Sequence, residues 1–196
     1  MSAPKVLILM GSKKDQEVML KGAELLEQFK IPYQMEVSSA HRNPERTKRL
    51  AQNAEKKGVK VIIAGAGMAA HLPGVVASHT NLPVIGVPLS ASSLSGLDSL
   101  FSIVQMPSGI PVATMAIGEA GAKNAAILAI QILALFDQKL KKRLDEFKKR
   151  EASSKGQGSR NKGRIATKSL KRNFRNLQRE EVGKLPEDLR RLFLYP

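Results

Sequence analysis

The sequence contains no cysteine and no tryptophan, and aromatic residues make up only 4% of its 196 positions. The absence of cysteine excludes disulfide bonds, thiolate metal sites and a cysteine nucleophile. It is compatible with a reducing compartment, and we expect a cytoplasmic protein. With so few aromatic residues, a core would consist mainly of Val, Ile, Leu, Ala and Met. The apolar content of 42% is sufficient to build one in a chain of this length.

Long apolar runs are also missing. No stretch approaches the roughly 20 apolar residues that a membrane-spanning helix needs, so we expect no membrane partner. The apolar run at 6–10 follows the N-terminus almost directly, and no small-residue cleavage site follows it. We therefore interpret this run as a first β-strand and not as a signal peptide.

The sequence signatures of several cofactor-dependent classes are absent as well. No group of His, Asp and Glu residues has the spacing of a metal site, and there is no P-loop for a nucleoside triphosphate. Gly65 and Gly67 lack the third glycine that a dinucleotide fingerprint requires. We therefore expect neither a metal nor a cofactor.

The net charge of +15 is concentrated near the C-terminus. Residues 1–138 contain 13 Lys and Arg against 10 Asp and Glu, whereas residues 139–196 contain 19 against 7. Residues 152–163 have the composition of a linker, and 165–179 could form a basic amphipathic helix. We expect a catalytic domain at 1–151 and a basic C-terminal extension at 152–196.

Short β-branched runs alternate with longer helical patterns along the first 150 residues. We predict strands at 5–10, 33–37, 59–64, 84–87 and 112–116, and helices at 14–29, 44–57, 71–79, 95–104 and 119–150. The last helix should be buried almost all round at 120–136 and charged beyond that point. Strict alternation of this kind predicts an α/β protein, a three-layer α/β/α sandwich with a parallel sheet. In such sheets, ligands bind where the strands end at their carboxyl edge.

The loop after the first predicted strand is one candidate site. Gly11 permits a sharp turn, and the amides that follow it could hold a phosphate together with the Ser12 hydroxyl. Asp15 could accept a hydrogen bond from a ribose hydroxyl. The alternative is an ordinary strand–helix turn in which Asp15 caps the helix.

The loop after the second predicted strand carries His41 and Arg42. Asn43 and Pro44 mark a helix start directly behind them. An imidazole there could act as a general acid or base, and the guanidinium could hold a phosphate. The alternative is a solvated His–Arg pair in a loop.

Residues 64–74, after the third predicted strand, are rich in glycine and alanine. A base or a ribose could lie directly against such a backbone. The alternative is close packing of small residues, with His71 as a capping residue. We interpret His79 as structural, and the loops at 87–99 and 105–111 as connections, unless the chain forms an oligomer.

These loops, taken in order, resemble the class I 5-(carboxyamino)imidazole ribonucleotide mutases over about residues 5–150. The resemblance is carried by Met10-Gly11-Ser12, Ser39-Ala40-His41-Arg42, Ala64-Gly65-Ala66-Gly67, Ala69-Ala70-His71-Leu72-Pro73-Gly74 and Ser102-Ile103-Val104-Gln105-Met106-Pro107. Lys14, Asn43 and Met68 depart from the residues that are common in the family. A glycine or another small residue is frequent at the position of Met68.

The resemblance implies a flavodoxin-like fold, a homo-octamer, and a step of de novo purine biosynthesis that needs no cofactor. The carboxylate would move from the exocyclic amine to carbon 4 of the imidazole ring, with His41 as the general acid and base. Substrate-binding positions would be Ser12, Asp15, Ser39, Arg42, Gly65, Ala66, Gly67, His71 and Leu72. A channelling partner could be the ATP-dependent carboxyaminoimidazole ribonucleotide synthase.

Two other functions remain open from the sequence. One is a carboxylase on the same fold that uses free carbon dioxide and aminoimidazole ribonucleotide. The other is a non-catalytic nucleotide- or RNA-binding protein that uses the basic extension, although we expect no nucleic-acid partner. RNA binding of that kind would depend strongly on salt and would survive the replacement of His41.

Overall fold

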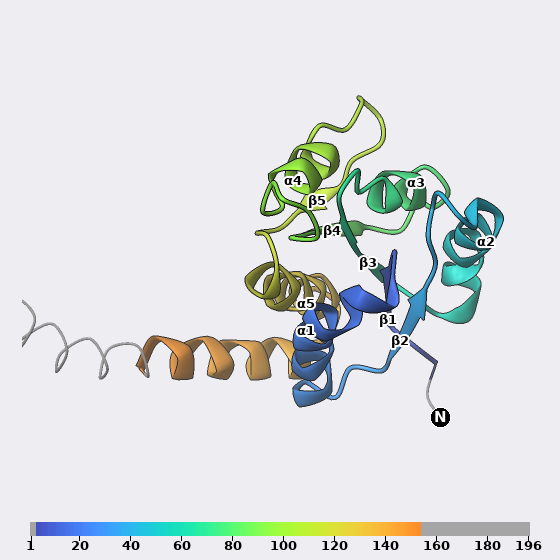
Figure 1. Ribbon diagram of the computed structural model, residues 1–196. Helices are drawn as coiled ribbons and strands as arrows, with labels where there is room; N and C mark the ends of the chain where they lie inside the picture. The colour runs from blue at the N-terminus through green and yellow to red at the C-terminus, as the bar shows by residue number, and fades with distance from the viewer. Residues whose placement is uncertain (1–2, 154–196) are drawn as a thin grey trace, which may run out of the picture. The chain divides into compact units, whose positions relative to one another are not determined.

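A computed structural model describes residues 3–153 of the chain (Figure 1). Five parallel strands form one sheet in the order β2-β1-β3-β4-β5. The strands are β1 (Val6–Met10), β2 (Tyr33–Val37), β3 (Val61–Gly67), β4 (Val84–Leu89) and β5 (Ala113–Thr114). This order is that of a flavodoxin-like sheet, so the predicted α/β class and parallel sheet are confirmed.

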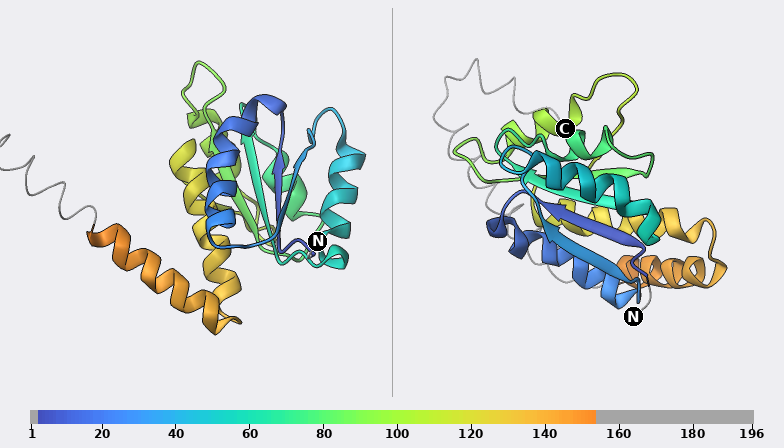
Figure 2. Two further views of the ribbon diagram at one scale, coloured as in Figure 1. Left: turned by 90° about the horizontal axis from the view of Figure 1, so that it is seen from below. Right: turned by 90° about the vertical axis from the view of Figure 1, so that its right-hand side faces the viewer.

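Helices cover both faces of the sheet (Figure 2). The helices α1 (Gln16–Gln28) and α5 (Glu119–Ala134) lie on one face and pack against each other. The other face is covered by α2 (Pro44–Ala54), α3 (Leu72–Ala77) and α4 (Leu97–Val104). Two 3₁₀ turns, Lys13–Asp15 and Glu55–Lys57, precede α1 and follow α2. The result is the predicted α/β/α sandwich.

The core lies between the sheet and these helices. The central strands β1 and β4 are buried along their whole length, as two-sided coverage requires, and β2 at the edge is only half-buried. Alternate residues of β1 face opposite layers, and Leu7 and Leu9 join the cluster beneath α2 and α3. The core consists mainly of Val, Ile, Leu, Ala and Met, as the small number of aromatic residues predicted.

The predicted single helix at 119–150 is wrong. α5 ends at Ala134, and helical structure resumes at 138–153 after a break. The Asp137 carboxylate caps the new start, because its Oδ1 accepts hydrogen bonds from the backbone N–H groups of Lys139 and Leu140 at 2.9 and 3.0 Å. Leu135 and Phe136 at the break are 71% and 92% exposed, so the expected burial through residue 136 is also wrong.

The chain divides into two compact units, Met1–Leu144 and Asp145–Pro196. The first unit contains the whole sheet. Of the second unit, residues 145–153 are described, and they are helical. The predicted helix at 165–179 and most of the predicted basic extension lie outside the described residues. Within residues 3–153, no helix is long and apolar enough to cross a membrane.

Candidate active site

The loop after β1 forms a tight, hydrogen-bonded turn. The Ser12 backbone N–H donates to Asp15 Oδ2 at 2.9 Å, and the Ser12 hydroxyl oxygen accepts from the Lys14 backbone N–H at 3.2 Å. Asp15 is buried and Ser12 is half-buried. Asp15 thus closes the 3₁₀ turn that precedes α1, and this turn holds the Ser12 hydroxyl at the carboxyl edge of the sheet.

Burial raises the pKa of the Asp15 carboxyl above its ordinary value of 3.8, and the hydrogen bond from the Ser12 N–H offsets part of this rise. The ionised carboxylate is therefore destabilised in the folded chain relative to the unfolded chain. Since the folded pKa is the higher one, the contribution of Asp15 to stability is fully present below pH 3.8. It is lost as the pH rises through the raised pKa.

The variant Asp15→Asn tests this linkage. The amide oxygen can still accept from the Ser12 N–H, but it carries no charge at any pH. The quantity to compare is the melting temperature of the variant minus that of the wild type. We expect this difference to be more positive at neutral pH than at a pH below 3.8, the ordinary pKa of the carboxyl. Thermal melts of both proteins under the two conditions measure the difference. An unchanged difference would mean that ionisation of Asp15 does not affect folding.

The loop after β2 is anchored at both ends. Ser38 and Thr47 are buried, and their hydroxyl groups are hydrogen-bonded at 2.8 Å. Asn43 caps α2 by accepting from the Arg46 backbone N–H at 3.2 Å, and Pro44 occupies the first turn, as predicted. Between these anchors, the exposed side chains of His41 and Arg42 stand at the carboxyl edge of the sheet.

Arg42 connects the first two loops. Its guanidinium donates to the Gly11 carbonyl oxygen at 3.4 Å, and its backbone N–H donates to the Ser39 hydroxyl at 3.3 Å. The Arg42 side chain thus lies beside the Gly11–Ser12 turn. A guanidinium, two serine hydroxyls and backbone amides are groups that bind a phosphate.

The loop after β3 holds His71 in a constrained backbone. Met68 and Ala70 have φ angles of 56° and 36°, in the left-handed region that favours glycine. Such strain is retained where the surrounding structure fixes it, often at functional sites. It also gives a physical reason for the glycine that is frequent in the family at the position of Met68. Leu72, directly after His71, is 2% exposed and fixes the start of α3.

The side chains of His41 and His71 are in contact at the carboxyl end of the sheet. His41 Nε2 lies 2.6 Å from His71 Nδ1, and both side chains are exposed. The resemblance implies that His71 lines a pocket, and the sequence gives no sign that His71 contacts His41. One general signal did indicate that the two histidines are near each other. Both follow strands of one parallel sheet, and the carboxyl ends of such strands lie at the same end of the sheet.

The remaining predicted site residues have little or no exposed side chain. Gly65 is buried in β3, and a Cβ there would meet the end of the Met19 side chain. The side chains of Ala66 and Leu72 belong to the core cluster beneath α2 and α3. Gly67 is half-buried at the end of β3. These four residues could therefore present backbone groups, but not side chains, to a ligand.

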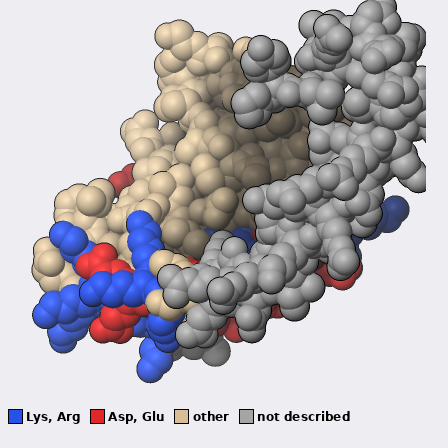
Figure 3. All heavy atoms as spheres, turned by 90° about the vertical axis from the view of Figure 1, so that its left-hand side faces the viewer, with Lys and Arg blue, Asp and Glu red and all other residues tan. Residues whose placement is uncertain are grey.

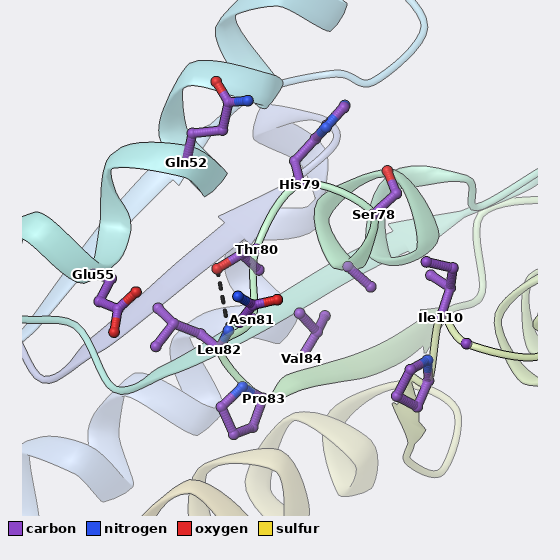
Figure 4. Close-up of a pocket in the computed structure, with 13 residues that line it drawn as sticks. Gln52, Glu55, Ser78, His79, Thr80, Asn81, Leu82, Pro83, Val84 and Ile110 are labelled. Carbon is purple, nitrogen blue, oxygen red and sulfur yellow. Dashed lines mark hydrogen bonds between the residues drawn. The ribbon is translucent and has the colours of Figure 1, made fainter.

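A groove of about 830 Å³ lies elsewhere, at the amino end of β4 (Figure 4). It is lined by Gln52 of α2, by Glu55 of the 3₁₀ turn that follows α2, by residues 77–84 and by residues 109–111. It contains none of the predicted site residues. His79, predicted on a helix face, lies beyond the end of α3 and lines this groove. Within the described residues, no group of three or more His, Asp or Glu side chains could hold a metal ion.

The structure is that of a flavodoxin-like α/β protein with two exposed, hydrogen-bonded histidines at the carboxyl end of its parallel sheet, the end at which such sheets bind ligands. The sequence matches the family described as AIR carboxylase over residues 5–154. The chain belongs to that family.

Relatives of known name are close in sequence. The N5-carboxyaminoimidazole ribonucleotide mutase of Saccharolobus solfataricus is 60% identical over 146 residues, which are 74% of this chain and 89% of that protein. The enzyme of the same name from Escherichia coli is 55% identical over 145 residues, covering 74% and 86%. The crystal structure of Treponema denticola PurE superposes with a TM-score of 0.72 at 30% identity, covering 80% of this chain and 96% of that one.

Proposed function

We propose that this protein interconverts 5-(carboxyamino)imidazole ribonucleotide and 5-amino-4-imidazolecarboxylate ribonucleotide in de novo purine biosynthesis. The observation that carries the proposal is the exposed His41 imidazole next to Arg42, whose guanidinium reaches the turn that begins at Gly11 and Ser12 and whose backbone N–H donates to the Ser39 hydroxyl. The identity of 53–60% to several proteins named as this mutase supports it.

The mechanism needs one group that gives and then takes a proton. In the first step, the bond between the exocyclic nitrogen and the carboxylate breaks, carbon dioxide leaves, and His41 protonates the nitrogen. In the second, carbon 4 attacks the carbon dioxide, and His41 removes the hydrogen from carbon 4 to restore the aromatic ring. Protons and charge balance over the cycle, and His41 ends as it began. An imidazole can do both near neutral pH.

The other residues hold the substrate in this scheme. Arg42, Ser12 and Ser39 bind the phosphate, and Asp15 accepts from the ribose. The backbone at Gly65, Ala66, Gly67 and Leu72 lies against the base and the carboxylate. Positioning of this kind converts the recapture of carbon dioxide into an effectively intramolecular step.

An assay with the labelled substrate tests the activity. The protein is mixed with substrate that carries ¹³C in its carboxylate, in excess unlabelled bicarbonate and without ATP. Formation of the 4-carboxylated isomer with the label retained supports the mutase. Loss of the label, with carboxylation of aminoimidazole ribonucleotide from bicarbonate, would make the protein a carboxylase instead. No product in either assay would contradict both activities.

We also propose that the protein is a cytoplasmic homo-octamer. The support for an oligomer is an apolar face on α4, where Leu97, Phe101 and Val104 recur at helical spacing and are 51%, 60% and 51% exposed. In Figure 3, the upper part of the visible face, on the side of α4 and α5, is nearly free of charged side chains. Substrate would come from an ATP-dependent enzyme that carboxylates the amine, a candidate for channelling.

The variant Phe101→Glu tests the α4 contact. A carboxylate buried in an apolar interface is unfavourable unless it is paired, so we expect the octamer to separate into smaller species. Light scattering after size-exclusion chromatography should give eight times the chain mass for the wild type and less for the variant. Leu20→Glu, on α1 and 38% exposed, is the matched control and should leave the mass unchanged. An intact octamer in Phe101→Glu would exclude α4 from the interface.

A further inference from the structure

The two imidazoles at the carboxyl edge share one hydrogen bond. The distance of 2.6 Å between His41 Nε2 and His71 Nδ1 requires a hydrogen on one nitrogen and a lone pair on the other. The ring planes are 82° apart and the ring centroids 4.7 Å apart. Since the residues lie 30 positions apart in different loops, the fold itself creates this contact.

We propose that His71 is a positioning residue that occupies Nε2 of His41 and leaves Nδ1 of His41 as the atom that exchanges protons with the substrate. This inference rests on the proposed mutase function. Among residues 3–153, Nδ1 of His41 has no hydrogen-bond partner, so it is the ring nitrogen that a ligand can reach. His71 then acts through His41, in place of the pocket-lining role that the resemblance implies.

The chemistry of the two steps decides which ring donates. To remove the hydrogen from carbon 4, Nδ1 of His41 must carry a lone pair, so neutral His41 holds its hydrogen on Nε2. That hydrogen is donated to Nδ1 of His71, which in turn keeps its own hydrogen on its Nε2. When Nδ1 of His41 takes up a proton, the bond to His71 is unchanged. The ring therefore gives and takes the proton without a flip.

The surroundings of the two histidines suit this role. The backbone of His41 is fixed by its neighbours, because the Asn43 N–H donates to the Ser39 carbonyl at 2.9 Å. Its exposed ring, however, has only His71 to orient it within the described residues. His71 stands between Ala70, in the left-handed region, and Leu72, which is buried. An exposed ring is thus held by a residue whose own backbone is firmly placed.

Histidine ¹⁵N spectra test the pairing without any substrate. The chain has only three histidines, so protein labelled with ¹⁵N-histidine gives few signals, and His79 in the distant groove is an internal reference. We expect a coupling between His41 Nε2 and His71 Nδ1, with the hydrogen on Nε2 of both rings. A hydrogen on Nδ1 of neutral His41 would overturn the proposal.

Three variants of His71 test its effect on the reaction. Asparagine places an amide oxygen near the position of Nδ1, glutamine places it further out, and leucine removes it. We expect kcat to fall about ten- to a hundredfold in His71→Leu and His71→Gln and to recover largely in His71→Asn. KM should change little in all three.

The possible outcomes separate the two proposals. A rise in KM with kcat unchanged would show that His71 only binds the substrate. A loss of activity in all three variants that is accounted for by a lower melting temperature would show that His71 is only structural. Either result overturns the positioning role while the mutase function stands. If the wild type is inactive in the labelled assay, the proposed function fails, and the ¹⁵N spectra still decide whether the pair exists.

Discussion

Replacing His41 by asparagine is expected to lower kcat for mutase conversion by about 10²–10⁴-fold, the range typical of a lost general acid or base. The asparagine amide resembles part of the imidazole in size, but it neither gives up nor takes up a proton near neutral pH. KM should change much less, because the phosphate contacts of Arg42, Ser12 and Ser39 remain. Initial rates measured over a range of concentrations of 5-(carboxyamino)imidazole ribonucleotide give kcat and KM separately.

The control for this variant is His79→Asn. It makes the same chemical change, but His79 lies in the groove at the amino end of β4 (Figure 4). His41, in contrast, follows β2 at the carboxyl end of the sheet. We expect wild-type rates. Activity of His41→Asn within about tenfold of the wild type, well short of the loss expected for a general acid or base, would remove His41 from the reaction. Salt-sensitive RNA binding that survives in the same variant would favour the non-catalytic alternative.

Some elements could be predicted from the sequence because their signals are local. The bounds of β2 agree with the prediction residue for residue, since turns bracket a short run of β-forming residues. The start of α2 is fixed by Asn43 and Pro44, which need no distant contact to cap a helix. The carboxyl edge as the place of the candidate site follows from the parallel sheet alone.

Other features depend on distances that a sequence does not contain. The break after α5 was missed because the helical pattern continues through residues 135–137, and only the carboxylate of Asp137 marks the new start. The hydrogen bond between His41 and His71 depends on how two loops approach each other. The burial of Ala66 and Leu72 depends on which face of β3 and α3 meets the core.

Gly121→Ala is expected to destabilise the fold by roughly 3 kcal/mol or more, at the upper end of what overpacking produces. Gly121 lies in the first turn of α5, and a Cβ there would collide with the backbone carbonyl of Ala116 and press on Val87 of β4. The Ala116 backbone cannot move away without shifting the chain around it, whereas a flexible side chain can change its rotamer. At an exposed helix position the same change would stabilise the protein by up to about 1 kcal/mol. The sign of the change in the free energy of unfolding therefore shows whether the collision outweighs the helix preference of alanine.

Urea unfolding of the variant beside Gly74→Ala measures this effect. At Gly74, a Cβ would meet only the terminal methyl and sulfur of Met106, at 2.9 and 3.1 Å, and this flexible end can move away. We expect a loss of about 1 kcal/mol or less there, because the helix preference of alanine offsets the local crowding. Equal stability of Gly121→Ala and the wild type would mean that the start of α5 can shift away from the Ala116 carbonyl and from β4. The close approach of the start of α5 to its neighbours would then not be required for folding.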